Sequence, residues 1–207
     1  MADIQALQTG RRGAALLGRE IRTELVRKSI HLVIGIVPTL ASWNRGATLA
    51  LLAGGIAFYA YCELLRLDGY EIPLISRVTS AAARRRDAGR FVLGPVTLGF
   101  GAMLSLLFFP EPAASLAIYA LAFGDGISSL AGRLFGSIRI PFTGGKSLEG
   151  SLACFTAVLL ASWSVTRRPL MSLAVAAFAT LVEAVPTKDL DNLLLPVAVG
   201  AFAHFLF

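Results

Sequence analysis

Seven apolar stretches, each close to the length of a membrane-spanning helix, constrain this chain more than any other feature. They occupy residues 29–43, 47–66, 91–109, 113–132, 150–166, 169–186 and 190–207. Because a helix needs roughly 20 apolar residues to cross a bilayer, these stretches leave little of the 207 residues for a soluble domain. The sequence predicts an all-α integral membrane protein: a single bundle of about seven transmembrane helices with short outer loops and longer cytoplasmic loops.

The composition excludes two other classes of protein. The chain is 56% hydrophobic and 15% charged, with a net charge of +6. A basic chain suggests nucleic acid, but nucleic-acid modules are not interrupted by runs of about 20 apolar residues. Cys62 and Cys154 lie in apolar stretches with no Cys or His at metal-ligand spacing, so neither a disulfide framework nor a zinc site is expected.

The basic residues are divided unequally between the two sides of the predicted bundle. Sixteen of the 19 fall on the side of the N-terminus, and only Arg45, Arg167 and Arg168 fall on the opposite side. Since basic loops stay in the cytoplasm, we expect a cytoplasmic N-terminus and a C-terminus on the other side. We divide the chain into a basic cytoplasmic N-terminal segment, residues 1–28, and a seven-helix membrane catalytic domain, residues 29–207.

Ionisable side chains stand inside or at the ends of the apolar stretches, where they are costly and indicate a functional site. A first group is spaced i, i+3, i+4 and i+7, and so shares one face of the helix entering the first span. This group is Glu24, Arg27, Lys28 and His31. Further groups lie at the cytoplasmic side of later spans: Glu63, Asp125, Glu149, Glu183, Asp189, Asp191 and Asn192. The sequence therefore predicts one site at the cytoplasmic end of the bundle.

Three of these groups also have a structural interpretation. Glu63 is as well explained by an interfacial ion pair with Arg66. Glu24 is explained by pairing with Lys28, and His31 by a hydrogen bond in the core.

Asp125 favours a functional role more strongly. It lies about two turns inside an apolar span, between glycines that let a phosphate or another backbone approach closely. We interpret it as a lone buried carboxylate. Asp125→Asn is then expected to leave the protein at least as thermally stable in the absence of ligands.

The segment 132–151 is glycine-rich and basic, and it ends at a helix start. Exposed backbone N–H groups, the helix N-terminus and Lys146 all favour phosphate binding. The loop is not a Walker A motif, because Ile140 replaces the first glycine and no β-strand is expected between two membrane helices. Nearby oxygen ligands suited to Mg²⁺ are Asp125, Glu149, Asp191 and Asn192. The predicted chemistry is phosphoryl or nucleotidyl transfer at a membrane surface.

Several short motifs follow one another in order along most of the chain. They are Glu24–His31 (ELVRKSIH), Glu63–Arg66 (ELLR), Gly124-Asp125 with Gly132–Gly136 (GRLFG), Lys146–Ser151 (KSLEGS), Glu183, and Asp191–Pro196 (DNLLLP). This ordered set resembles the polyprenol kinase family, which contains dolichol kinase, phytol kinase and a CTP-dependent diacylglycerol kinase. The resemblance implies a membrane enzyme that phosphorylates a lipid alcohol with CTP and a divalent metal, Mg²⁺ for example.

The resemblance also implies roles for individual residues. The nucleotide-binding set is Arg133, Gly136, Gly144, Gly145, Lys146, Ser147, Glu149 and Gly150. The metal set is Asp125, Glu149, Asp191 and Asn192, with the choice between Asp189 and Asp191 left open. The catalytic set is Arg27, Lys28, His31, Asp125 and Lys146. Either His31 or Asp125 accepts the hydroxyl proton, and Glu24, Glu63 and Glu183 complete the site.

Two alternative functions are weighed against this one. The Gly-Asp and Lys-Ser-x-Glu-Gly motifs are also similar to phosphatidate cytidylyltransferase, but that family's C-terminal signature is missing after Ser151. A transporter would use the intramembrane charges as an ion path, yet it leaves the 132–151 loop unexplained. The small pair Gly132 and Gly136 packs helices within one chain or between two, so a homo-oligomer stays open.

Overall fold

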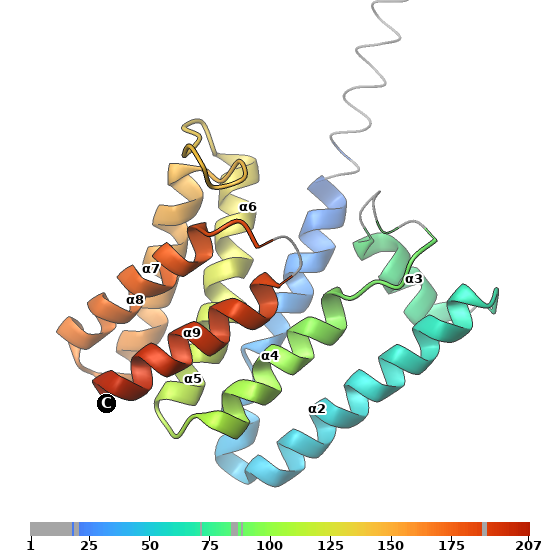
Figure 1. Cartoon of the computed structure of the whole chain (residues 1–207), viewed down its shortest axis with the longest axis horizontal. Coiled ribbons are helices and arrows are strands. Elements are labelled where there is room, and N and C mark those ends of the chain that lie inside the picture. The colour runs from blue at the N-terminus through green and yellow to red at the C-terminus, as the bar shows by residue number, and fades with distance from the viewer. Residues whose placement is uncertain (1–17, 19–20, 71, 84–86, 88, 188–189) are drawn as a thin grey trace, which may run out of the picture.

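The computed structural model describes residues 18, 21–70, 72–83, 87, 89–187 and 190–207. Within these residues all regular structure is helical, and the β pairing is limited to an isolated bridge between Arg139 and Ser147. A helix over residues 21–34 comes first. It is followed by α2 (Val37–Leu67), α3 (Pro73–Ala82), α4 (Gly94–Phe108), α5 (Ala113–Tyr119), a π-helical turn (Ala120–Asp125), α6 (Gly126–Leu134), α7 (Leu148–Thr166), α8 (Pro169–Ala184) and α9 (Asp191–Leu206) (Figure 1). The all-α prediction is confirmed.

The membrane-like character of the helices is also confirmed. Three described helices are long and apolar enough to cross a bilayer: Val37–Leu67, Ala113–Leu134 and Leu148–Thr166. Three more are apolar but shorter: Gly94–Phe108, Pro169–Ala184 and Asp191–Leu206. Part of the shortening is local, since Pro95 and Pro169 stand at the first turns of α4 and α8, where proline starts a helix. The number of seven crossings stays a prediction.

The predicted turn between the first two apolar stretches is a break inside α2. Asn44 departs from helical geometry, with φ −154° and ψ 101°. Its side-chain Oδ1 accepts a hydrogen bond from Ala47 N at 2.9 Å, which caps the second half of the helix. The neighbouring Arg45 donates to the carbonyl oxygens of Leu106 and Phe109, and this ties the turn to the end of α4.

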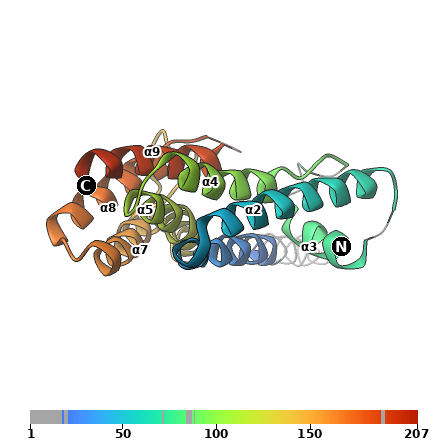
Figure 2. The same cartoon turned by 90° about the horizontal axis from the view of Figure 1, so that it is seen from below.

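The helices run alternately up and down, so the connections gather at two ends (Figure 1). Residues 89–93 before α4, the α6–α7 loop, and the end of α8 with the start of α9 lie at one end, together with the start of the first helix. The C-terminus lies near the opposite end. Seen from below, α2 and α3 stand at one side of the molecule and α7 and α8 at the other (Figure 2).

The central helix, α5 with the π-helical turn, is the most deeply packed part of the molecule. Leu116, Ile118 and Leu121 are fully buried. Small residues between them, such as Ala117 and Ala120, let α4, α7 and α9 pack closely against this helix. Asp125 closes the π-helical turn, so its backbone is held from several sides.

Two boundaries differ from the expectation. Residues 67–90, between the second and third apolar stretches, form one of the expected long cytoplasmic loops, but they contain the ten-residue helix α3, which begins at Pro73. Residues 21–28, assigned to the N-terminal segment, are helical and continue without a break into the first apolar stretch. Arg84–Arg86, Lys188 and Asp189 lie outside the described residues.

Candidate active site

A polar cavity of about 410 Å³ lies where the first helix, α6, the α6–α7 loop and the ends of α8 and α9 meet. Many of the predicted site residues line it: Glu24, Arg27, Asp125, Arg133, Gly144, Gly145, Lys146, Ser147, Gly150, Glu183 and Asp191. Sequence reasoning missed other lining residues: Ser128, Ser129, Gly132, Arg139 and Ser151. The missed serines and Arg139 are common on helix surfaces and in loops, and only their position in the fold distinguishes them.

Asp125 holds two groups of the first helix. Its Oδ2 lies 2.5 Å from Lys28 Nζ and 2.9 Å from His31 Nδ1. Lys28 is completely buried, and the other two side chains are nearly so. We call these three residues the Asp125 cluster. The carboxylate is therefore paired, and its interpretation as a lone charge was wrong because the sequence does not reveal which helix packs against it.

The second oxygen of Asp125 is less occupied. Among the described residues, the hydrogen-bond contact of its Oδ1 is a long one, 3.5 Å, with Ser129 Oγ. The flanking glycines serve packing: a Cβ at Gly124 would lie 3.0 Å from Val158, and one at Gly126 would lie 3.3 Å from Leu32. The absence of a side chain at these glycines lets α7 and the first helix pack closely against the π-helical turn and α6. The close packing of the first helix brings Lys28 and His31 into contact with the Asp125 carboxylate.

A second ion pair crosses the polar cavity. Lys146 Nζ lies 2.8 Å from Glu183 Oε1, and Ser128 Oγ donates to the same oxygen at 3.1 Å. The loop thus places its lysine opposite the end of α8. Lys146 keeps partial exposure, whereas Glu183 is buried.

The entrance side of the cavity carries Glu24 between two arginines. Its oxygens lie 2.6 Å from Arg27 and 3.3 Å from Arg133. Burial opposes ionisation of Glu24, but the adjacent Arg27 guanidinium prevails and lowers the pKa of the carboxyl below its ordinary value. These arginines, rather than Lys28, are the ion-pair partners of Glu24.

The loop before α7 has a defined shape. Gly144 and Gly145 adopt φ values of +71° and +95°, which side chains other than glycine rarely adopt. Ser147 caps α7 by accepting a hydrogen bond from Gly150 N at 3.2 Å. Glu149 Oε1 accepts from the backbone N–H groups of Ser137 and Ile138, at 2.8 and 3.2 Å. Glu149 therefore holds the loop and does not line the polar cavity.

The remaining glycines bring α6 and α7 together. A Cβ at Gly150 would lie 2.8 Å from Ser128 O, and one at Gly136 would lie 2.7 Å from Ser147 Oγ. Gly132 faces Ser147 and Gly150 in the same way. The small pair at 132 and 136 is thus used inside the chain, and Gly136 does not line the cavity.

Two other predicted residues lie away from the polar cavity. Glu63 binds Arg66 through two 2.8 Å contacts and accepts a hydrogen bond from Val92 N at 2.8 Å. Asn192 Nδ2 donates to Thr97 Oγ1 at 2.9 Å, joining α9 to α4. These contacts explain the burial of Glu63 and of the Asn192 amide nitrogen, while Asn192 Oδ1 has no hydrogen-bond partner among the described residues.

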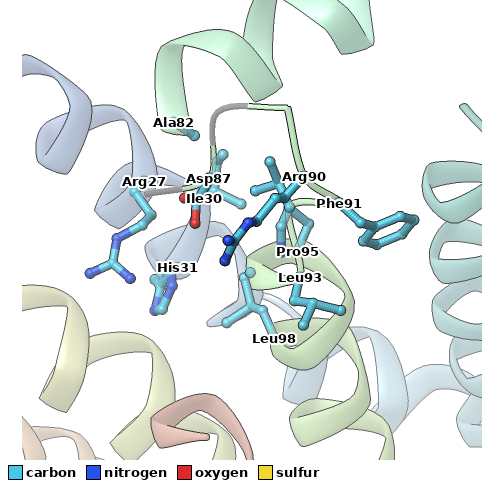
Figure 3. Close-up of a pocket in the computed structure, with 12 residues that line it drawn as sticks. Arg27, Ile30, His31, Ala82, Asp87, Arg90, Phe91, Leu93, Pro95 and Leu98 are labelled. Atoms are coloured by element: carbon cyan, nitrogen blue, oxygen red, sulfur yellow. The ribbon is translucent and has the colours of Figure 1, made fainter. Parts of the chain in front are cut away.

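A second cavity, of about 240 Å³, lies on the other side of the first helix. It is mostly apolar, and the segment before α4 forms much of its wall (Figure 3). Arg27 lines both cavities, while His31 lines the second one. No motif predicts this cavity, because its apolar wall, including Ile30, Phe91 and Leu98, consists of residues that any membrane helix carries.

The donor atoms around the polar cavity are hard oxygens. Asp125, Glu183 and Asp191 line it, and all three also surround a small side pocket. In the described part of the chain, no group of three or more His, Cys, Asp or Glu residues is arranged to hold a metal by itself. Ser151 Oγ, buried in the wall, has no hydrogen-bond partner there. This donor set fits Mg²⁺ that is bound together with phosphate oxygens.

Comparisons with known proteins identify relatives across almost the whole chain. It is 28% identical over 211 residues to phytol kinase 1, chloroplastic, of Arabidopsis thaliana, covering 90% of this chain and 68% of that protein. It is 28% identical over 204 residues to farnesol kinase, chloroplastic, of the same plant, covering 88% of this chain and 65% of that protein. The chain thus spans about two thirds of the length of these relatives. No family model matches, and no solved structure matches.

Proposed function

We propose that this chain phosphorylates the hydroxyl of an isoprenoid alcohol in a membrane, with CTP as the donor. The phytol kinase and farnesol kinase relatives support the reaction, and the resemblance to the polyprenol kinase family supports the choice of CTP. The products are the alkyl monophosphate and CDP. The relatives named for phytol and farnesol favour a prenyl alcohol over diacylglycerol.

The observation that carries the proposal is the contact between Asp125 and His31. Asp125 lines the polar cavity, and His31 Nδ1, 2.9 Å away, belongs to a ring that lines the second cavity. A carboxylate that holds an imidazole orients it for proton transfer. A nucleotide on one side and a hydroxyl on the other would meet at this pair.

The polar cavity offers the charges that a triphosphate needs. Lys146, Arg133 and Arg139 supply positive charge, and Gly144 and Gly145 supply an exposed backbone turn. A phosphate entering the cavity would compete with Glu183 for Lys146. The released Glu183 carboxylate then becomes an additional oxygen ligand.

Mg²⁺ would be held by Asp125 Oδ1 and Asp191 together with phosphate oxygens, with Glu183 near it. When bound, the ion neutralises charge on the phosphates and on the leaving diphosphate. The chain's own residues do the positioning: Lys28 neutralises Oδ2 of Asp125, and this leaves Oδ1 for the cavity.

We propose one proton transfer and one phosphoryl transfer for the reaction. His31 accepts the proton of the alcohol as the hydroxyl oxygen forms its bond to the terminal phosphorus. The bond between that phosphorus and the bridging oxygen breaks, and the electrons leave with CDP. We assign the general base to His31, since Oδ2 of Asp125 is occupied by Lys28 and by His31 itself.

We place this site at the cytoplasmic side of a multi-pass bundle, with the C-terminus on the opposite side. Support comes from the 16 basic residues on the side of the N-terminus. The gathering of the polar loops at one end of the molecule agrees with this placement (Figure 1).

The test is an assay of the purified protein with CTP labelled at either the γ- or the α-phosphate, against phytol, farnesol, dolichol and diacylglycerol. Label from the γ-phosphate is expected in the lipid, with release of CDP. Lipid that carries label from the α-phosphate, with release of pyrophosphate, would identify a cytidylyltransferase and contradict the kinase.

A further inference from the structure

We infer that the second cavity is the acceptor site, and that it binds only the hydroxyl-bearing end of the alcohol and leaves the tail in the bilayer. The inference rests on the proposed kinase function and deepens it. It predicts an enzyme that selects its substrate by the head of the molecule and tolerates tails of different length.

The two cavities adjoin through named side chains. Arg27 is part of both walls, and the contact between His31 and Asp125 connects one wall with the other. A hydroxyl in the second cavity would therefore lie beside His31. The side of His31 that faces Asp125 leads to the phosphate site.

The wall chemistry suits an amphipathic alcohol. Four of the lining residues are polar, namely Arg27, His31, Asp87 and Arg90, while Ile30, Pro95 and Leu98 are among those that provide apolar surface (Figure 3). Leu93, at the start of α4, lines the cavity while 52% of its surface is exposed. A tail that passes this rim would continue along the outside of the helices, where apolar residues face the membrane.

The size of the cavity limits what it can recognise. A volume of about 240 Å³ lies below the roughly 300–1,000 Å³ of typical ligand pockets. A cavity of this size suits the hydroxyl and the first part of an isoprenoid chain better than a whole phytol chain. Phytol and farnesol share the same allylic head and differ in their tails, so a head-reading cavity accommodates both.

The wall is also held in place. Glu63, fully buried, accepts the hydrogen bond from Val92 N, and Arg66 donates to Arg90 O at 3.0 Å. These contacts fix the segment before α4 against α2. Glu63 is therefore a positioning residue for the acceptor cavity, and this gives the second predicted motif a role.

The first test narrows the cavity at its rim. Leu93→Trp is expected to raise the KM for the alcohol about tenfold or more, with the KM for CTP unchanged within about twofold. Leu107→Trp is the matched control, since Leu107 lies on the same helix with the same 52% exposure but does not line the cavity. It should leave both constants unchanged.

A second pair of variants keeps the test valid if Leu93→Trp does not fold. Ile30→Trp fills the wall from the first helix, and Val33→Trp, on the exposed side of that helix, is its control. If the wild type phosphorylates alcohols but both cavity variants keep its alcohol KM, the inference is overturned and the kinase function stands. If the wild type phosphorylates no alcohol at all, the proposed function fails first.

The tail is tested with farnesol and geranylgeraniol, which have the same head and differ by one isoprenoid unit. Presented at equal surface concentration in the same vesicles, they should give kcat/KM values within about threefold, because one extra apolar unit that stays in lipid changes no protein contact. A difference of more than about tenfold would place the tail inside the protein and contradict the inference.

Discussion

The polar cavity and the acceptor cavity are neighbours, yet they are built in opposite ways. The first consists of charged and hydroxyl side chains and glycines that come from segments far apart in the sequence. The second consists mostly of ordinary apolar residues, together with Arg27, His31, Asp87 and Arg90. Charges are conspicuous in an apolar sequence because they are costly there. A cavity for a hydrocarbon needs only space between apolar side chains, and such residues do not stand out in the sequence of a membrane protein.

The largest expected effect comes from Asp125, which lines the polar cavity and contacts His31 of the acceptor cavity. Asp125→Asn should abolish nearly all activity, because it removes the charge proposed for Mg²⁺ and the orienting partner of His31. It should also destabilise the protein by about 3–5 kcal/mol, since Lys28 would remain buried without its partner. Phosphorylation assays and thermal unfolding in detergent measure the two effects.

A double variant separates these two effects. Asp125→Asn combined with Lys28→Met removes both charges and should recover much of the lost stability while staying inactive. Unchanged stability of the single Asp125→Asn variant would mean that the buried pair does not form.

The next effect belongs to the polar cavity alone. Lys146→Ala should reduce kcat/KM by about 100- to 1000-fold, because it removes a charge that stabilises the transferring phosphate. The KM for the alcohol should stay the same. Arg77→Ala, which removes an exposed basic residue of α3, is the control. Equal losses of kcat/KM in the two variants would mean that Lys146 contributes only to the overall positive charge and has no specific role at the transferring phosphate.

Nucleotide choice should produce an intermediate effect. Excess unlabelled CTP is expected to suppress the transfer of label to the alcohol more strongly than the same concentration of ATP. Competition with both nucleotides at fixed Mg²⁺ measures the ratio. Equal suppression would contradict the assignment of CTP and leave the two-cavity arrangement intact.

The smallest effect should come from the acceptor side. Glu63→Gln keeps the size of the side chain but weakens its bond to Arg66, so the segment before α4 becomes less well held. We expect a rise of about two- to fivefold in the alcohol KM, equivalent to about one weakened hydrogen bond, with the CTP KM unchanged. A change in the CTP KM instead would place this segment at the nucleotide.

The sequence predicted the helical class and the grouping of polar residues because burying charge in lipid is costly wherever it happens. It could not predict which groups the individual polar side chains contact. Asp125 meets Lys28 across 97 positions, and Glu149 turns toward the loop backbone instead of the cavity. Both outcomes depend on which helices pack together. Helix α3 was missed for a related reason, since its ten residues are too few and too polar to resemble a span.

The π-helical turn Ala120–Asp125 changes the phase of the helix that contains it. Each residue of an α-helix advances the side chains by about 100°, so one additional residue in a turn rotates everything that follows by about this angle. The buried side chains of α5 are mainly those of alanine, leucine and isoleucine, whereas α6 presents Ser128 and Ser129 to the polar cavity. Deleting Ala122 would let a regular helix form and turn those hydroxyls away from the cavity. One additional residue in a turn is thus enough to give a single membrane helix a hydrophobic first part, α5, and a second part, α6, whose polar side chains face the polar cavity.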